Sequence, residues 1–177
     1  TNQDTQFVKL YSEEKVAQIQ GDHRFFQCSK QCCDKVWDAV KPVEKMMEAM
    51  GDTTYIPEEL IPRCPVCGAE AYPWVRGYGN FLQGKKYDDQ YQKISKYIMN
   101  NKDKKILFLE LGVGRITPMF IQEPFWNLTS NLPKAYYISV NVQYDFLPEQ
   151  IEEKGFVIRK DIGKVLEDTR IMMEERK

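Results

Sequence analysis

The sequence has no long hydrophobic run, no excess of charge of one sign, and only one histidine. No apolar stretch approaches the roughly 18–20 residues that a membrane-spanning helix needs. The net charge is -1 over 177 residues, so the overall composition gives no sign of a nucleic-acid or membrane partner. Because no charged leader precedes an apolar stretch at the N-terminus, we expect a cytoplasmic protein.

Cysteine is present in an odd number, five, whereas a secreted disulfide-bonded domain more often has an even number. Three residues separate Cys28 from Cys32, and two separate Cys64 from Cys67 in "RCPVCG". Two such thiol pairs can form a tetrahedral shell around a structural zinc ion, which is the predicted arrangement. The alternative is two unlinked pairs of buried or redox cysteines. Cys33 is the spare thiol, which either packs as a small hydrophobe or replaces Cys32 as a ligand.

Three segments have helical patterns. Residues 87–101 repeat tyrosine and isoleucine at spacings of three and four, which predicts an amphipathic helix. Residues 36–50, "VWDAVKPVEKMMEAM", are partly helical in pattern, and we expect Pro42 to interrupt them. Residues 163–177 predict a helix at the C-terminal end of the sequence.

Three short apolar runs predict strands: "KKILFLELGVG" (104–114), "PKAYYISVNVQ" (133–143) and "KGFVIRKDI" (154–162). Connecting or helical segments separate them, which favours a parallel sheet in an α/β fold.

Polar or glycine residues follow each of these runs. Gly112 and Gly114 follow the first strand, Asn141 the second and Asp161 the third. Ligands of open α/β sheets bind outside the carboxyl ends of the strands, so a shared nucleotide-binding edge is one interpretation. An ordinary turn at the end of a strand is the other, because "GVG" lacks the full GxGxxG pattern.

Taken together, the motifs resemble those of a known family. "TNQDTQF", "QGDHRFFQC", the two cysteine pairs, "LFLELGVGRITP", "YYISVN" and "DIGKVL" occur in the order typical of sirtuins, which are NAD-dependent deacylases or ADP-ribosyltransferases. The resemblance implies a partial Rossmann-like parallel sheet with an inserted small zinc-binding module. It places part of the NAD-binding domain in residues 1–22, the zinc module in 23–84 and the C-terminal half of the NAD-binding domain in 85–177.

Two departures narrow the resemblance. Gln20 stands where the deacylases carry a catalytic histidine, and the N-terminal glycine-rich motif is absent. The sequence is therefore most similar to the macrodomain-linked bacterial sirtuins, which act as protein ADP-ribosyltransferases on a lipoyl-carrier protein. The resemblance also implies that the chain corresponds to the C-terminal part of such a protein and does not encode a complete NAD pocket.

The resemblance assigns roles to four residues near the N-terminus. Asn2 would hold the nicotinamide ribose or an ordered water, and Asp4 would fix the ribose or the loop, unless it only caps a helix or turn. Gln20 cannot act as a general base, because an amide does not titrate near neutral pH. His23 either supplies the missing titrating group or is an exposed surface histidine.

The adenosine side would be formed by residues that follow the three strands. The expected NAD-binding residues are Gly112, Val113, Gly114, Arg115, Asn141, Asp161 and Ile162.

Three functions are compatible with these motifs. The first is a sirtuin-type ADP-ribosyltransferase that uses NAD, with a protein acceptor that could be a lipoyl-carrier protein working with a macrodomain partner. The second is a deacylase that uses His23 as its base. The third is a zinc-stabilised module that binds NAD or a partner without turnover.

Overall fold

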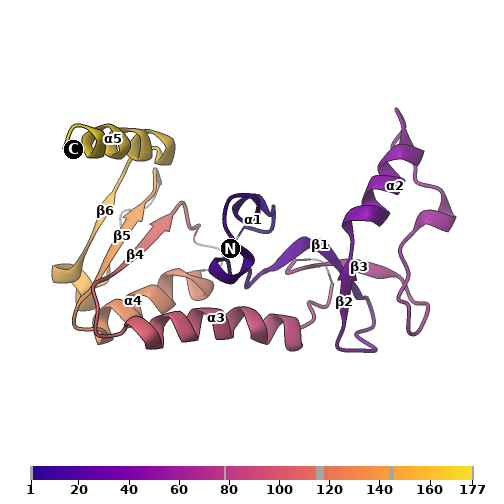
Figure 1. Cartoon of the computed structure of the whole chain (residues 1–177), viewed down its shortest axis with the longest axis horizontal. Coiled ribbons are helices and arrows are strands. Elements are labelled where there is room, and N and C mark those ends of the chain that lie inside the picture. Colours follow the sequence, from indigo (N-terminus) through magenta and orange to yellow (C-terminus); the bar gives the residue numbers. More distant parts are fainter. Residues whose placement is uncertain (1, 78, 115–117, 144–145, 177) are drawn as a thin grey trace. The chain divides into compact units, whose positions relative to one another are not determined.

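The computed structural model describes residues 2–77, 79–114, 118–143 and 146–176. The chain divides into two compact units, Thr1–Lys96 and Tyr97–Lys177. The division falls within one helix, α3 (Lys85–Asn101), which confirms the helix predicted over residues 87–101. Each unit contains its own three-stranded sheet (Figure 1).

The first unit is built on an antiparallel sheet in the order β2-β1-β3. Its strands are β1 (Gly21–Cys28), β2 (Val36–Asp38) and β3 (Ala71–Val75). Gly21 pairs with Val75 and has a φ of 95°. A Cβ atom on Gly21 would lie 2.1 Å from the carbonyl oxygen of Trp74, so only glycine fits where the two strands approach each other.

Pro42 does not interrupt a helix, contrary to the expectation from the sequence. It lies in the first turn of α2 (Val40–Met50), which continues to Gly51. The first N–H groups of a helix have no partner within it, so a proline there removes no hydrogen bond. The other helical segments of this unit are α1 (Gln6–Leu10), η1 (Glu13–Lys15) and η2 (Glu58–Leu60).

The second unit contains a parallel sheet in the order β4-β5-β6, which confirms the three predicted strands (Figure 1). They are β4 (Ile106–Leu111), β5 (Ala135–Val140) and β6 (Gly155–Ile158). The fold class is therefore mixed α/β with a small parallel sheet. Helical segments connect or follow the strands: η3 (Pro118–Phe120), α4 (Gln122–Asn131), η4 (Glu149–Lys154) and α5 (Ile162–Glu174), the last confirming the predicted C-terminal helix.

The two faces of the parallel sheet have different surroundings. On one face, Ile106 and Phe108 of β4 form a buried cluster with Tyr137 of β5, and α4 covers this cluster with Phe125 and Trp126. Alternate residues point to the opposite face, where large apolar side chains remain exposed: Leu107, Leu109, Leu111, Tyr136 and Phe156. Among the helices of the described residues, none combines the length and the hydrophobicity needed to cross a membrane.

Candidate functional site

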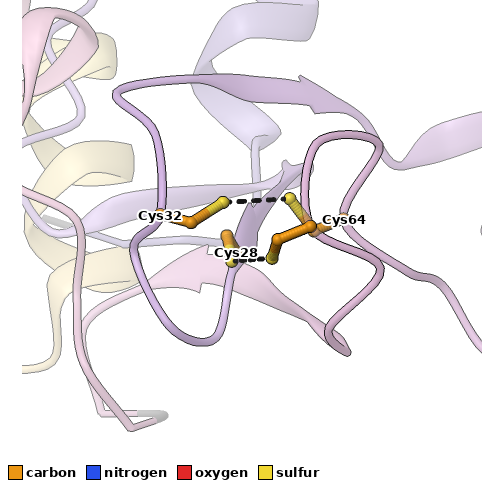
Figure 2. A group of neighbouring side chains, drawn as sticks. Cys28, Cys32 and Cys64 are labelled. Atoms are coloured by element: carbon orange, nitrogen blue, oxygen red, sulfur yellow. Dashed lines mark hydrogen bonds between the residues drawn. The ribbon is translucent and has the colours of Figure 1, made fainter.

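Four cysteine sulfur atoms gather at one end of the first unit. The Sγ atoms of Cys28 and Cys67 lie 3.6 Å apart, and those of Cys32 and Cys64 lie 3.5 Å apart (Figure 2). All four sulfurs lie within 4.8 Å of one another. Two of the four cysteines are buried and two are exposed. The predicted pairs therefore come together in one group that can hold a metal ion, and Cys33 is not part of it.

Backbone N–H groups prepare two of these thiols for the thiolate form. The amides of Cys67 and Val66 lower the pKa of Cys64 to about 6, and the Val66 nitrogen lies 3.4 Å from its sulfur. The amides of Cys32 and Lys30 lower the pKa of Cys28. Thiolate is the form that binds metal ions, so Cys28 and Cys64 are suitable ligands.

The N-terminal segment is attached to the sheet of the first unit by Gln3. Its side-chain amide donates to the carbonyl oxygens of Gln20, at 3.0 Å, and of Arg76, at 2.9 Å. The backbone N–H of His23 in turn donates to the Gln3 carbonyl, at 3.3 Å. The structure thus brings the segment that carries Asn2 close to the backbone of Gln20 and His23.

The exposure of these candidates differs. Asn2, Asp4 and His23 are exposed, whereas Gln20 is partly buried. One oxygen of the Asp4 carboxylate accepts the backbone N–H of Gln6 at 3.2 Å, at the start of α1. Asp4 therefore makes the turn interaction that the sequence offered as the alternative to a role in ligand binding.

The loop after β3 is held by a buried glutamine. The side chain of Gln27 donates to the carbonyl of Asn80 and accepts the backbone N–H of Leu82 at 2.8 Å. The Arg76 guanidinium lies 4.7 Å from the centre of the Phe81 ring. The sequence does not mark Gln27 as important, because its partners are backbone groups that every residue type carries.

A cavity of about 290 Å³ lies in the second unit, after the carboxyl ends of β4 and β5. Five of the residues expected from the sequence border it, together with two that we did not expect. The seven lining residues are Gly112, Gly114, Asn141, Val142, Gln143, Asp161 and Ile162.

The backbone conformation at position 112 favours glycine. Its φ is +68°, in the left-handed region, and a Cβ atom would lie 2.9 Å from Cδ1 of Ile162. A Cβ atom on Gly114 would meet no atom within 4 Å, so that position is open. The backbone of the glycine turn is therefore accessible from the cavity.

Asn141 holds this turn in place. Its side-chain nitrogen donates to the carbonyl of Val113 at 3.0 Å, and its side-chain oxygen accepts the backbone N–H of Gln143 at 2.9 Å. Asp161 caps α5 by accepting the N–H of Lys164 at 3.0 Å. Asn141 and Asp161, two of the polar residues at the cavity, thus also stabilise the surrounding backbone.

The other expected residues do not line the cavity or lie outside the described part of the chain. Val113 is not among the lining residues, and its carbonyl accepts the hydrogen bond from Asn141. Arg115, which we expected to contact NAD, lies outside the described residues. Asn2, Asp4, Gln20 and His23 belong to the first unit, and the cavity belongs to the second. The two unexpected lining residues, Val142 and Gln143, directly follow Asn141 in the sequence. Their position just beyond β5 was the signal that could have identified them.

Comparison with known proteins gives two relatives, and no family model matches the chain. A protein ADP-ribosyltransferase of Staphylococcus aureus (strain Mu50 / ATCC 700699) is 30% identical over 168 residues, which cover 94% of this chain and 53% of the relative. A probable bifunctional ADP-ribose hydrolase/ADP-ribosyltransferase of Fusarium oxysporum f. sp. cubense is 25% identical over 169 residues, which cover 88% of this chain and 28% of the relative. The chain spans about half the length of the first relative and less than a third of the second. It is thus related in sequence to proteins named ADP-ribosyltransferases.

Proposed function

We propose that the chain is part of a sirtuin-type protein ADP-ribosyltransferase that uses NAD. The observation that carries this proposal is the cavity of about 290 Å³ beside the glycine turn, at the carboxyl ends of two parallel strands. Nucleotides bind at this edge of open α/β sheets. The names of the two relatives support ADP-ribosyl transfer as the reaction.

The cavity fits part of a dinucleotide. Its volume is near the lower end of the roughly 300–1,000 Å³ of small-molecule sites, which suits one nucleoside rather than the whole of NAD. Gly112 and Gly114 leave room for close approach, and the Asp161 carboxylate can accept a hydrogen bond from a ribose hydroxyl. We assign the adenosine half of NAD to these residues.

The exposed face of the parallel sheet supports the assignment to a partial Rossmann-like domain. Leu107, Leu109 and Tyr136 are all more than 40% exposed. Strands of parallel sheets are apolar on both faces because helices usually cover both. We assign residues 1–22 and 85–177 to the NAD-binding domain and residues 23–84 to the zinc module.

We assign a structural zinc ion to the cysteine cluster. Zn–S bonds of about 2.3 Å place sulfur atoms roughly 3.8 Å apart in a tetrahedron. The observed separations of 3.6 and 3.5 Å are close to that value. With four thiolate ligands the site is closed, so zinc would stabilise the module rather than take part in the reaction.

The reaction assigned to NAD begins with cleavage of the bond between nicotinamide and ribose, after which a protein acceptor attacks the ribose. Asn2 and Gln20 would contact the nicotinamide ribose by hydrogen bonds, and Asp4 would fix the loop that carries Asn2. Gln20 supplies no titrating group, which favours transfer over deacylation. The acceptor that we propose is a lipoyl-carrier protein acting with a macrodomain partner. The name of the Fusarium relative joins an ADP-ribose hydrolase to an ADP-ribosyltransferase, which supports ADP-ribosyl chemistry for this chain.

His23 keeps deacylation as a second candidate. The residue is exposed, and its backbone is bonded to Gln3 in the segment that carries Asn2. Histidine is the side chain that most often acts as a general base in enzymes, so His23 is the candidate for that role. Release of O-acyl-ADP-ribose from an acylated peptide, abolished in His23→Gln, would favour this function.

Labelled NAD tests the main proposal. The protein in its full natural length is incubated with NAD labelled in the adenylate phosphate and with a lipoyl-carrier protein. We expect label on the carrier protein and free nicotinamide in equal amount. Absence of label from every protein, with NAD left intact, would overturn the transferase assignment.

A further inference from the structure

Glu110 is a buried carboxylate in the middle of the apolar run "LFLEL". It is 1% exposed and lies on the same face of β4 as Ile106 and Phe108. Among the described residues, no lysine or arginine forms an ion pair with it. Burial raises the pKa of Glu110, and hydrogen bonds from Tyr137, Ser139 and Gln122 partly offset this rise.

Three side chains donate to this carboxylate. Oε1 accepts from Nε2 of Gln122 at 2.9 Å and from Oγ of Ser139 at 3.2 Å, and Oε2 accepts from the hydroxyl of Tyr137. Tyr137 and Ser139 are buried, at 0% and 4% exposure. The donors come from β5 and from the first residue of α4, so Glu110 joins three elements.

These contacts lie next to the glycine turn. Glu110 is two residues before Gly112, and Ser139 is two residues before Asn141. Gln122 begins α4, so its bond to Glu110 connects the two ends of the segment between β4 and α4. That segment includes the two glycines that border the cavity.

Burial of a carboxylate at position 110 carries a free-energy penalty. An apolar side chain would occupy the same place without the cost of burying a charge. The carboxylate can accept from all three donors at once, which fixes the end of β4 against β5 and α4. Its contribution is therefore to the position of the turn rather than to burial of apolar surface.

We propose that Glu110 and Gln122 are positioning residues for the nucleotide cavity. Their hydrogen bond closes the connection between β4 and α4, and thereby holds Gly112 and Gly114 where the adenosine half of NAD would lie. Neither residue lines the cavity. The inference rests on the proposed function, because it assigns a purpose to the cavity that this function uses.

Exchange of the carboxylate of Glu110 and the amide of Gln122 tests the proposal. In Gln122→Glu, assayed at a pH high enough to ionise both groups, two carboxylates would face each other across 2.9 Å and repel each other. We expect KM for NAD to rise roughly tenfold, as for loss of a hydrogen bond to a charged group, with kcat changed less than KM. The double variant Glu110→Gln/Gln122→Glu restores one amide and one carboxylate, so we expect it to recover most of the wild-type KM.

Two further variants separate positioning from general stability. Gln122→Ala removes the hydrogen bond to Glu110 without adding charge, and should raise KM for NAD by a smaller factor than Gln122→Glu. This variant tests the proposal if Gln122→Glu fails to fold. Leu128 of the same helix packs against the buried cluster but does not line the cavity, so Leu128→Ala should lower the melting temperature and leave KM unchanged. Equal KM values in wild type, Gln122→Glu and Gln122→Ala would overturn the positioning role alone. Failure of the wild-type protein to bind NAD would instead overturn the proposed function, and this inference with it.

Discussion

The side-chain amide of Gln3 donates to the carbonyl oxygen of Gln20 at 3.0 Å. The same amide also donates to the carbonyl of Arg76 at 2.9 Å, so one side chain holds the N-terminal segment against the ends of β1 and β3. The proposed roles of Asn2 and Asp4 depend on this attachment, because both are exposed residues on that segment.

Replacement of Gln3 should therefore affect activity more than stability. Gln3→Ala removes two hydrogen bonds of about 0.5–1.5 kcal/mol each from an exposed segment. We expect kcat/KM for ADP-ribosyl transfer to fall roughly tenfold, with a small change in melting temperature. The matched control is Gln6→Ala, since the Gln6 side chain makes only a 3.4 Å contact with the Asp4 carbonyl. If both variants retained wild-type kcat/KM, the attachment would have no part in the reaction.

The cysteine cluster predicts one zinc ion per chain. Cys64→Ser should lower the bound zinc well below one equivalent, because a serine hydroxyl is a poor ligand for a four-thiolate site. We expect the loops that carry the cysteines to lose their structure, since the zinc ion would join them, and far-UV circular dichroism would report the loss. Metal content is measured after purification without added zinc.

Cys33→Ser provides the control for this prediction. Cys33 is a neighbour of Cys32 but is outside the cluster of four sulfurs. We expect it to retain a full equivalent of zinc and the wild-type spectrum. A wild-type protein that contains no zinc would contradict the metal assignment, as would equal zinc loss in both variants.

The strands of the second unit could be predicted because the physical signal for them is local. Apolar runs of strand length, with connections too long for hairpins, define β4, β5 and β6 and favour a parallel sheet. Four of the seven cavity residues followed from the same signal, since residues after parallel strands meet at one edge of the sheet: Gly112, Gly114, Asn141 and Asp161. The cysteine pairs were equally visible, because spacing alone limits which thiols can share a metal ion.

Other features depend on tertiary contacts that leave no pattern in the sequence. Gln3 and Gln27 bond to backbone groups, which are the same in every residue and so cannot mark a partner. Pro42 was expected to interrupt a helix because the sequence does not show that this residue lies in the first turn of α2. Helix boundaries are the least certain part of a sequence pattern. Glu110 did carry a signal, because the alternation of β4 puts this acidic residue on the buried face.

The two glycines after β4 should respond differently to a methyl group. Gly112→Ala forces a residue with a side chain into a φ of +68° and brings Cβ to 2.9 Å from Ile162. We expect a loss of about 1–2 kcal/mol in the free energy of unfolding from the backbone alone. Gly114→Ala meets no atom within 4 Å and should leave stability unchanged, but its methyl group borders the cavity and should weaken NAD binding.

Chemical denaturation and calorimetric titration with NAD separate these effects. Weaker NAD binding by a stable Gly114→Ala protein would place the nucleotide next to that glycine. If Gly114→Ala bound NAD as wild type does, the ligand would lie elsewhere in the cavity or outside it.

The buried carboxyl of Glu110 should make stability depend on pH in an unusual direction. Its pKa is raised in the folded protein, chiefly by burial. At pH values below the ordinary glutamate pKa, the Glu110 carboxyl is protonated in both the folded and the unfolded chain. Its ionisation then contributes nothing to the free energy of unfolding. As pH rises, the unfolded chain loses the proton first, so the unfolded state gains stability until the pH exceeds the folded pKa.

The comparison with Glu110→Gln isolates this effect. The amide does not titrate, so the free energy of unfolding of wild type minus that of the variant should decrease as the pH rises above the ordinary glutamate pKa of about 4, until the pH passes the raised pKa of the folded protein. Urea denaturation at several pH values measures the difference, and Glu175→Gln, at an exposed position, controls for the lost negative charge. A difference that increased over this range would mean that the three hydrogen bonds outweigh burial and lower the pKa of Glu110. The carboxylate would then stabilise the fold by itself, and its position beside the glycine turn would no longer require a separate explanation.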